Sequence, residues 1–160
     1  MMTMSNCTSS STSDDLDASN DEHLLLDKQM CFPLYSAANA VVRAYRPLLE
    51  VLDLTYLQYI VMMVLWQSDG VSVKDLGQRL HLDSGTLTPL LKRLEVKGLV
   101  LRKRGEHDER VRTLHLTAQG QELHAKAVSV PAEMFCKLKL APEEMQMMKL
   151  LCEKLLLQLQ

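Results

Sequence analysis

A mainly α-helical fold with one small β-hairpin is predicted by three features of this sequence. The segments 72–82 and 83–98 each place apolar residues at the spacing of an amphipathic helix, and only a short turn separates them. Two strand-like segments, 99–104 and 110–117, follow and flank the polar loop 105–109. Helix, turn, helix and basic hairpin in this order are typical of a winged helix-turn-helix, which places one helix in a DNA groove and the hairpin on the neighbouring backbone.

The chain begins with a polar segment, residues 1–22, that is rich in Ser, Thr and Asp. Such a composition cannot bury enough apolar surface to fold, so we expect a disordered tail. The apolar content rises from Leu24 onward, and the segment 33–52 predicts a helix that is kinked or interrupted at Pro47. The apolar stripe of this helix consists of Leu34, Ala37, Ala38, Val41, Val42 and Tyr45.

Capping residues predict where the next three helices begin and end. Their N-caps are Thr55, Ser72 and either Asp83 or Ser84. Ser72 and Asp75 also have the spacing of a capping box. The first of these helices is expected to end near Gln67, and the last is expected to stop at Gly98, because glycine is favoured just beyond a helix C-terminus.

Two further helices are predicted in the C-terminal part of the chain. Thr117 is expected to cap a fifth helix that runs into Pro131. Pro142 is expected to start a sixth, because proline is favoured in the first helical turn and the two glutamates that follow suit the positive helix end. The segment 131–141 then becomes the linker between them.

The last helix carries an apolar stripe that needs a partner surface: Met145, Met148, Leu151, Cys152, Leu155, Leu156 and Leu159. We expect the first and last helices to form a homodimer seam, whose two-fold symmetry suits a pseudo-palindromic operator. The alternative is packing within one subunit. The expected organisation is a tail, 1–22, and a single domain, 23–160, in which 23–54 and 118–160 dimerise and 55–117 forms the DNA-binding lobe.

Length and composition argue against several other classes of protein. A chain of 160 residues with 47% apolar residues fits one domain. The longest apolar candidate, 59–66, is shorter than the ~18 residues that span a bilayer, and the N-terminus lacks the pattern of a secretory signal. We therefore expect a cytoplasmic protein without membrane association. Its four cysteines should be reduced thiols, and no metal-spaced cluster or glycine-rich phosphate loop predicts a cofactor.

Charge is unevenly distributed along the chain. Between Arg79 and Arg112, nine Lys or Arg residues stand against five Asp or Glu residues, a net charge of +4. Because the whole chain carries −2, the remainder carries −6. Segregation of this kind directs a positive patch toward phosphate, and double-stranded DNA is the expected partner. The alternative is that these charges only line a solvated face.

Candidate DNA contacts lie on the fourth helix and at the tip of the hairpin. Leu87, Leu90, Leu91 and Leu94 fall on one face, which leaves Ser84, Thr86, Thr88, Lys92 and Arg93 facing outward or near the first turn. The short hydroxyl side chains suit base edges, and the two cations suit phosphate or guanine. Pro89 should bend the helix locally. In the hairpin, Arg110 follows Asp108 and Glu109, and an acidic neighbour can hold its guanidinium for insertion into the minor groove, unless the loop is simply solvated.

Cys31 is the candidate reactive thiol. A cysteine is usually a small buried hydrophobe, but Pro33, in a first helical turn, puts Cys31 close to a helix N-terminus. That position favours the thiolate, which is the form that peroxides oxidise. Tyr35 falls one turn along the same face. Tyr45 and Tyr56 are too distant in sequence to be local partners, but they can approach from another subunit or serve as core residues.

Two stretches of sequence resemble a known family. The stretch 82–95, LDSGTLTPLLKRLE, with GLVLRKR and Asp108-Glu109-Arg110, resembles the MarR family of dimeric winged-helix repressors. The stretch 31–66, from CFPLYS to MMVLW, is similar to the organic hydroperoxide resistance regulators within that family. The resemblance covers residues 24–157 and implies a dimeric MarR-like architecture. It also implies that Cys31 senses organic hydroperoxides while Tyr45 and Tyr56 hydrogen-bond its thiolate across the dimer.

The same resemblance gives a part to a second cysteine. Cys136, which follows Pro131, matches the two-cysteine pattern of the subfamily. The resemblance therefore implies an intersubunit disulfide between Cys31 and Cys136 that releases operator DNA. Cys152 is expected to be inert in the core, and Cys7, in the tail, is assigned no role.

Two other functions stay open from the sequence. An enzyme with Cys31 as its nucleophile would need a His/Asp constellation, and none is visible. A MarR-type repressor gated by a non-covalent aromatic ligand, bound between the dimer and DNA domains, would not need Cys31 for DNA release.

Overall fold

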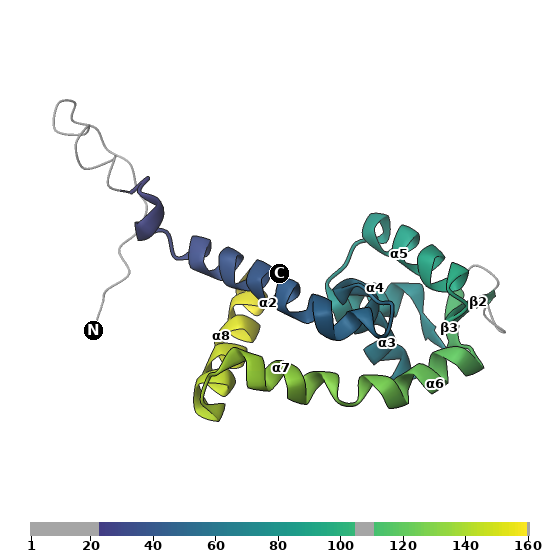
Figure 1. Ribbon diagram of the computed structural model, residues 1–160. Coiled ribbons are helices and arrows are strands. Elements are labelled where there is room, and N and C mark those ends of the chain that lie inside the picture. The colour runs from purple at the N-terminus through teal and green to yellow at the C-terminus, as the bar shows by residue number, and fades with distance from the viewer. Residues whose placement is uncertain (1–22, 105–110, 160) are drawn as a thin grey trace, which may run out of the picture. The chain divides into compact units, whose positions relative to one another are not determined.

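The computed structural model describes residues 23–104 and 111–159 (Figure 1). Contacts divide the described residues into two compact units, one that ends at Val41 and one that begins at Val42. In the first unit, a short 3-10 helix, η1 (Leu26–Lys28), precedes the start of α2 (Cys31–Glu50), a 20-residue helix that continues into the second unit. Its exposed apolar residues include Leu24, Leu26 and Met30.

Both prolines of α2 lie inside the helix. The predicted start at Pro33 is two residues late, because Cys31 is already helical. Pro33 falls in the first turn, where a missing N–H costs no intrahelical hydrogen bond. Pro47 does not interrupt α2, but the helix ends three residues later, and Asp53 then adopts a left-handed backbone with φ of 51°.

The second unit contains the predicted winged helix-turn-helix. It is built from α3 (Tyr56–Gln67), β1 (Val71–Ser72), α4 (Val73–Leu80), α5 (Ser84–Val96), β2 (Val100–Arg104) and β3 (Arg112–Leu116). The predicted N-caps are confirmed: Thr55 forms a full capping box with Gln58, Ser72 accepts from the Asp75 N–H at 3.0 Å, and Asp83 caps α5. Gly98 has a φ of 71°, as a glycine after a helix end requires.

A third strand was not predicted from the sequence. β1 has only two residues, and it joins the hairpin to give an antiparallel sheet of order β1-β3-β2. Val71 lies opposite Leu114, and Val100 lies opposite Leu116. Strand β1 fastens the turn after α3 to the base of the hairpin.

The core lies between α3, α4, α5 and the sheet. The four predicted inward leucines of α5, Leu87, Leu90, Leu91 and Leu94, are all buried. They join Val61, Met62 and Leu65 of α3, Leu76 of α4, and Val100 and Leu114 of the sheet. Burial of this face leaves the opposite side of α5 exposed.

The C-terminal part differs from the prediction. The fifth helix ends early, and three helices follow the sheet: α6 (Ala118–Ala127), α7 (Val130–Leu138) and α8 (Pro142–Leu159). Pro131 starts α7 rather than ending the helix before it, because it occupies the first turn. The expected linker 131–141 is therefore mostly helical, and Cys136 lies within α7.

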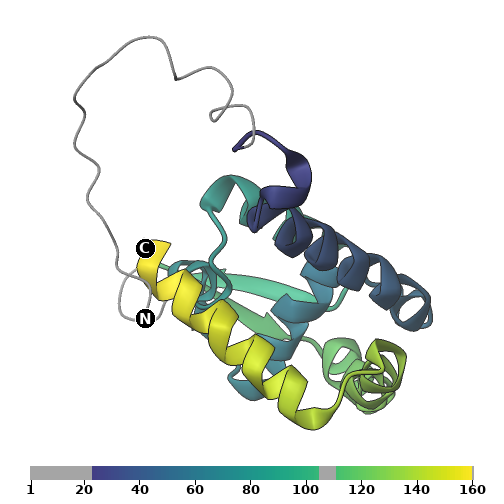
Figure 2. The ribbon, with the colours of Figure 1, turned by 90° about the vertical axis from the view of Figure 1, so that its left-hand side faces the viewer.

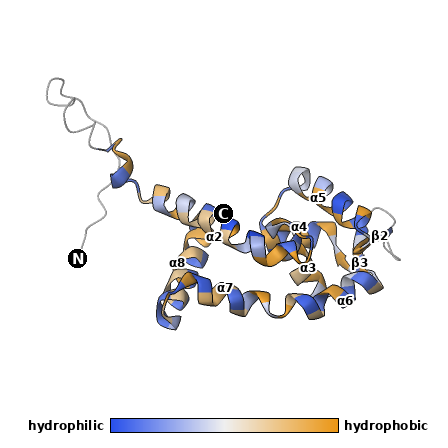
Figure 3. Cartoon of the chain, viewed as in Figure 1, coloured by the Kyte–Doolittle hydropathy of each residue, from blue (hydrophilic) through white to orange (hydrophobic). Residues whose placement is uncertain are grey.

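Helix α8 is one unbroken helix (Figure 2) with no buried residue. Its apolar side chains are exposed or half-buried, and orange residues run along it in Figure 3. The predicted stripe is thus not covered by the described residues of its own chain. Cys152 is half-buried, so the expectation that it is a core residue is wrong for the chain by itself.

The core of α5 gives a first test. Leu94 is 0% exposed, so Leu94→Ala should lower the free energy of unfolding by about 2–5 kcal/mol. Val96, two residues later, is 82% exposed. Val96→Ala should therefore change the free energy of unfolding by no more than about 0.5 kcal/mol. Urea unfolding at a fixed protein concentration measures both. Equal losses would contradict the described orientation of α5.

Candidate nucleic-acid interface and thiol site

The outward face of α5 carries the predicted DNA-contacting residues. Ser84, Thr88, Lys92 and Arg93 are exposed, and Thr86 is half-buried. The hydroxyl of Thr88 donates to the Ser84 carbonyl at 2.7 Å, and the hydroxyl of Thr86 donates to Asp83 at 3.2 Å. Their oxygens remain able to accept hydrogen bonds. Hydrogen bonds from the Thr86 N–H and hydroxyl hold the pKa of Asp83 below its ordinary value.

The hairpin is fastened to α5 by a pair that the sequence did not indicate. Glu95, near the end of α5, accepts from the Arg102 Nε at 2.8 Å and from its backbone N–H at 3.3 Å. The hydrogen bond from Arg102 is the main reason that the pKa of Glu95 is lowered. Arg102 therefore fixes the angle between α5 and β2. The predicted tip residues, Asp108 and Arg110, lie outside the described residues.

A second polar junction ties the turn after α3 to β3. One carboxylate oxygen of Asp69 accepts from the Leu116 N–H at 2.7 Å, and the other lies 3.1 Å from Nδ1 of His115. The second ring nitrogen of His115 lies 3.1 Å from the Thr113 hydroxyl. Burial alone would raise the pKa of Asp69, but the bonds from Leu116 and His115 lower it overall.

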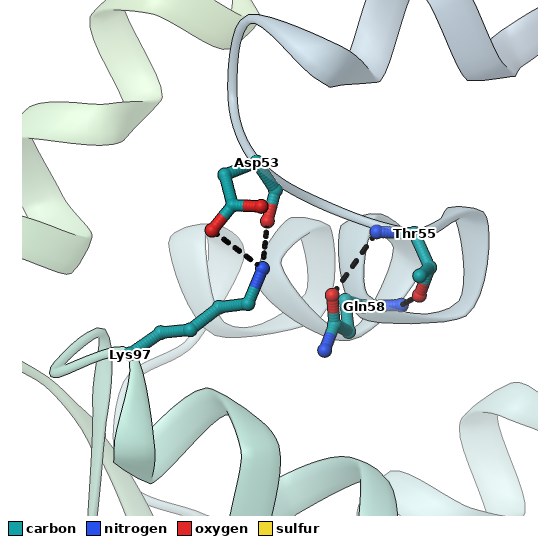
Figure 4. Close-up of polar contacts among 4 residues, drawn as sticks. All are labelled: Asp53, Thr55, Gln58 and Lys97. Carbon is teal, nitrogen blue, oxygen red and sulfur yellow. Dashed lines mark hydrogen bonds and ion pairs between the residues drawn. The ribbon is translucent and has the colours of Figure 1, made fainter.

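A third junction joins the end of α5 to the turn after α2 (Figure 4). The ammonium group of Lys97 lies 2.8 Å from the Asp53 carboxylate and also donates to the Asp53 backbone carbonyl. In the same view, Gln58 and Thr55 form the capping box of α3. Asp53 and Lys97 are 44 residues apart in the sequence, so no local pattern could have predicted their contact.

The described cysteines are free thiols. Cys31 is exposed at the first residue of α2, so it is not the buried hydrophobe that most cysteines are. Cys136 is exposed on α7. Cys7 lies outside the described residues.

Two of the three predicted thiolate-stabilising tyrosines come together in the second unit. The rings of Tyr45 and Tyr56 are 4.9 Å apart, and Tyr59 lies 6.0 Å from Tyr45. Burial is the main cause that raises the pKa of Tyr45 and of Tyr56, so both stay protonated donors at neutral pH. Neither hydroxyl has a hydrogen-bond partner among residues 23–104 and 111–159. Tyr35 belongs to the first unit and is exposed.

Neither a metal-binding cluster nor a membrane-spanning helix occurs among the described residues. No group of three or more His, Cys, Asp or Glu side chains in 23–104 and 111–159 is arranged to hold a metal ion. No helix in this part of the chain has both the length and the apolar character needed to cross a bilayer.

Comparison with known proteins identifies the family. A family model described as transcriptional regulator SarA/Rot matches residues 43–127. An organic hydroperoxide resistance transcriptional regulator of Bacillus subtilis is 42% identical over 128 residues, which cover 80% of this chain and 87% of that relative. The regulator TtmR of Methylorubrum extorquens is 53% identical over 111 residues, which cover 69% of this chain and 57% of that protein.

Solved structures agree with the sequence relatives. Reduced AbfR bound to DNA, a protein of Staphylococcus epidermidis, has a TM-score of 0.73 at 30% identity and covers 89% of this chain and 99% of its own. A structure of MarR shares the fold, with a TM-score of 0.63 at 23% identity, and covers 79% of this chain and 96% of its own. The chain therefore belongs to the SarA/Rot family of MarR-like winged-helix transcriptional regulators and is related to the organic hydroperoxide resistance regulators.

Proposed function

We propose that this protein is a homodimeric, cytoplasmic repressor that binds operator DNA and releases it when an organic hydroperoxide oxidises Cys31. The observation that carries the proposal is an exposed thiol at the first residue of a 20-residue helix. It occurs in a chain that is 42% identical to an organic hydroperoxide resistance regulator. The mechanism needs no cofactor, and the oxidation is a single event per thiol rather than a catalytic turnover.

The position of Cys31 supports the proposed reactivity. The unpaired N–H groups at a helix N-terminus favour a negative charge, so the thiolate is stabilised there. The thiolate attacks the outer oxygen of the hydroperoxide and the O–O bond breaks. The sulfur becomes a sulfenic acid, while the alkoxide leaves and takes up a proton to become an alcohol.

The tyrosines are proposed to assist this step from the other subunit. Tyr45 and Tyr56 are protonated donors without a partner among the described residues, and a hydroxyl that donates to sulfur stabilises the thiolate. We include Tyr35 as a further thiolate-stabilising residue because its exposed ring lies one turn along the same helix from Cys31.

DNA release is proposed to follow a second reaction. The Cys136 thiolate attacks the sulfenic sulfur of the partner's Cys31; hydroxide leaves, is protonated to water, and a disulfide forms. A disulfide tolerates Cα separations only up to ~7 Å. Because Cys136 lies within α7, closing the bond moves a whole helix, and the two DNA-reading lobes lose their register with successive major grooves.

Dimerisation and DNA binding are proposed to use different surfaces of the protein. The uncovered apolar side chains of α8 supply a dimer seam, and we place α2 beside it. The outward side of α5 faces the major groove with five residues: Ser84, Thr86, Thr88, Lys92 and Arg93. We propose that Arg110, with Asp108 as an acidic neighbour in the sequence, contacts the minor groove.

The disulfide is tested by electrophoresis. Non-reducing gels of protein treated with an organic hydroperoxide should show a covalent dimer that reverts with dithiol. It should be absent from Cys31→Ser and Cys136→Ser and present in the matched control Cys152→Ser. Oxidised protein that leaves operator DNA while running only as a monomer would contradict the intersubunit bond.

The tyrosines are tested by oxidation rate. Tyr45→Phe and Tyr56→Phe keep the rings but remove the donors, so the Cys31 thiolate should lose hydrogen bonds and its oxidation should slow, with unfolding nearly unchanged. Thiol loss after rapid mixing with hydroperoxide measures the rate. Tyr59→Phe, in the same ring cluster, is the matched control. Rates equal to wild type in both variants would limit these tyrosines to packing.

The DNA face is tested by affinity. Arg110→Ala should weaken operator binding by about 1–3 kcal/mol because it removes a cation from the minor groove. Lys92→Ala should weaken binding to all duplexes about equally, as loss of a phosphate contact does. Lys154→Ala removes an exposed cation from α8 and serves as the control. Gel shifts at a stated salt concentration measure the affinities. If Arg110→Ala bound the operator as tightly as the wild type, the minor-groove contact would be refuted.

A further inference from the structure

We propose that the N-terminus of α3, with Gln58 at its centre, is a binding subsite for a phosphodiester group of the DNA backbone. The inference rests on the proposed function for the identity of its ligand. The subsite is a cavity of about 230 Å³ between α3 and α5. Thr55, Leu57 and Gln58 line it from one side, and Thr86, Pro89 and Arg93 line it from the other.

Gln58 supplies the central observation. It is a polar residue in the core with 3% of its surface exposed. Its side-chain oxygen accepts from the Thr55 N–H at 3.0 Å. Only the oxygen of an amide can accept, so the Nε2 group must lie on the opposite side, and Figure 4 shows it pointing away from the Thr55 nitrogen.

The Nε2 group of Gln58 has two N–H donors and no hydrogen-bond partner among the described residues. No fully enclosed side-chain polar atom in this part of the chain lacks a partner. Nε2 must therefore keep contact with solvent although its residue is otherwise buried. The cavity that Gln58 lines provides that access, so the donors point into it.

The helix end adds further donors at the same place. The capping box satisfies the N–H groups of Thr55 and Gln58. The N–H groups of Tyr56 and Leu57 precede the first intrahelical hydrogen bonds and have no acceptor within the helix. Together with the dipole of a 12-residue helix they form a positive end that favours an anion.

Arg93 contributes the charge. It is exposed on the cavity wall, and no ion pair engages it in the described chain. The carboxylate of Asp53, in the turn before α3, is paired with Lys97. Amide donors and a guanidinium group form a donor-rich site, which suits the oxygens of a phosphate.

The geometry of α5 favours DNA as the source of this phosphate. Helical spacing puts Ser84, Thr88 and Lys92 on one flank of its outward face and Thr86, Pro89 and Arg93 on the other. When α5 lies in the major groove, the second flank faces a wall of the groove, and the N-terminus of α3 lies against that strand. A phosphate held there fixes orientation and carries no sequence information.

Gln58→Glu is the discriminating variant. Glutamate keeps the oxygen of the capping box and is a favoured residue at this helix position, so folding is retained. It replaces the two donors with a negative charge. Gln67→Glu makes the same change at the exposed other end of α3 and is the matched control.

Binding is measured with reduced protein at one low salt concentration. Two duplexes are compared, one with the operator sequence and one with an arbitrary sequence. Gln58→Glu should weaken binding to both duplexes by about tenfold or more, because a charged hydrogen bond becomes a repulsion. Gln67→Glu should stay within about twofold of wild type. Equal affinities of the two variants, with unchanged thermal unfolding, would overturn the subsite.

A second arm uses inorganic phosphate and does not depend on DNA binding or on Cys31. In ¹⁵N-resolved NMR spectra, millimolar phosphate should shift the Gln58 side-chain amide and the Tyr56 and Leu57 backbone amides. If wild-type protein bound no duplex, the proposed function would fail while this arm still tested the anion site. No shifts would refute the site, and shifts without a DNA effect of Gln58→Glu would refute the phosphodiester assignment.

Discussion

Four buried leucines of α5 determine what the rest of the winged helix can do. Leu87, Leu90, Leu91 and Leu94 pack against α3, α4 and the sheet, and each is worth a few kcal/mol of stability. A helix with one face buried has no freedom to rotate about its axis. The same burial therefore fixes which hydroxyls and cations point outward. The surface that is proposed to face DNA therefore follows from the packing of the core.

Polar contacts set the remaining angles around α5. Glu95 with Arg102 holds the hairpin, Asp69 with His115 holds the base of the sheet, and Lys97 with Asp53 holds the end of α5 against the turn after α2. Each is partly exposed, so its contribution to stability is about 0–1 kcal/mol. Their main effect is geometric, because each joins two elements that the apolar core alone would leave free to shift slightly.

The sequence predicted the features that depend on neighbouring residues. Thr55, Ser72 and Asp83 cap their helices because a side chain and the N–H three residues on belong to one turn, and the leucine spacing of α5 gave its inward face. It failed where distant segments decide the outcome. Strand β1 has two residues and exists only because β3 lies beside it. The burial of Gln58 and its unpaired side-chain amide could not be predicted from the sequence, because they depend on α5 packing beside α3.

Pro131 shows how one local ambiguity reaches the mechanism. A proline ends the helix before it or starts the helix after it, and both readings fit the same sequence. The structure has it starting α7, which places Cys136 on a helix. A thiol in a flexible linker could form a disulfide while the rest of the chain stayed in place. A thiol within α7 cannot, since its sulfur moves only with the helix or by partly unwinding it. Cys31 is likewise part of a helix, as the first residue of α2. Strain from the proposed disulfide is therefore carried by helices at both of its ends.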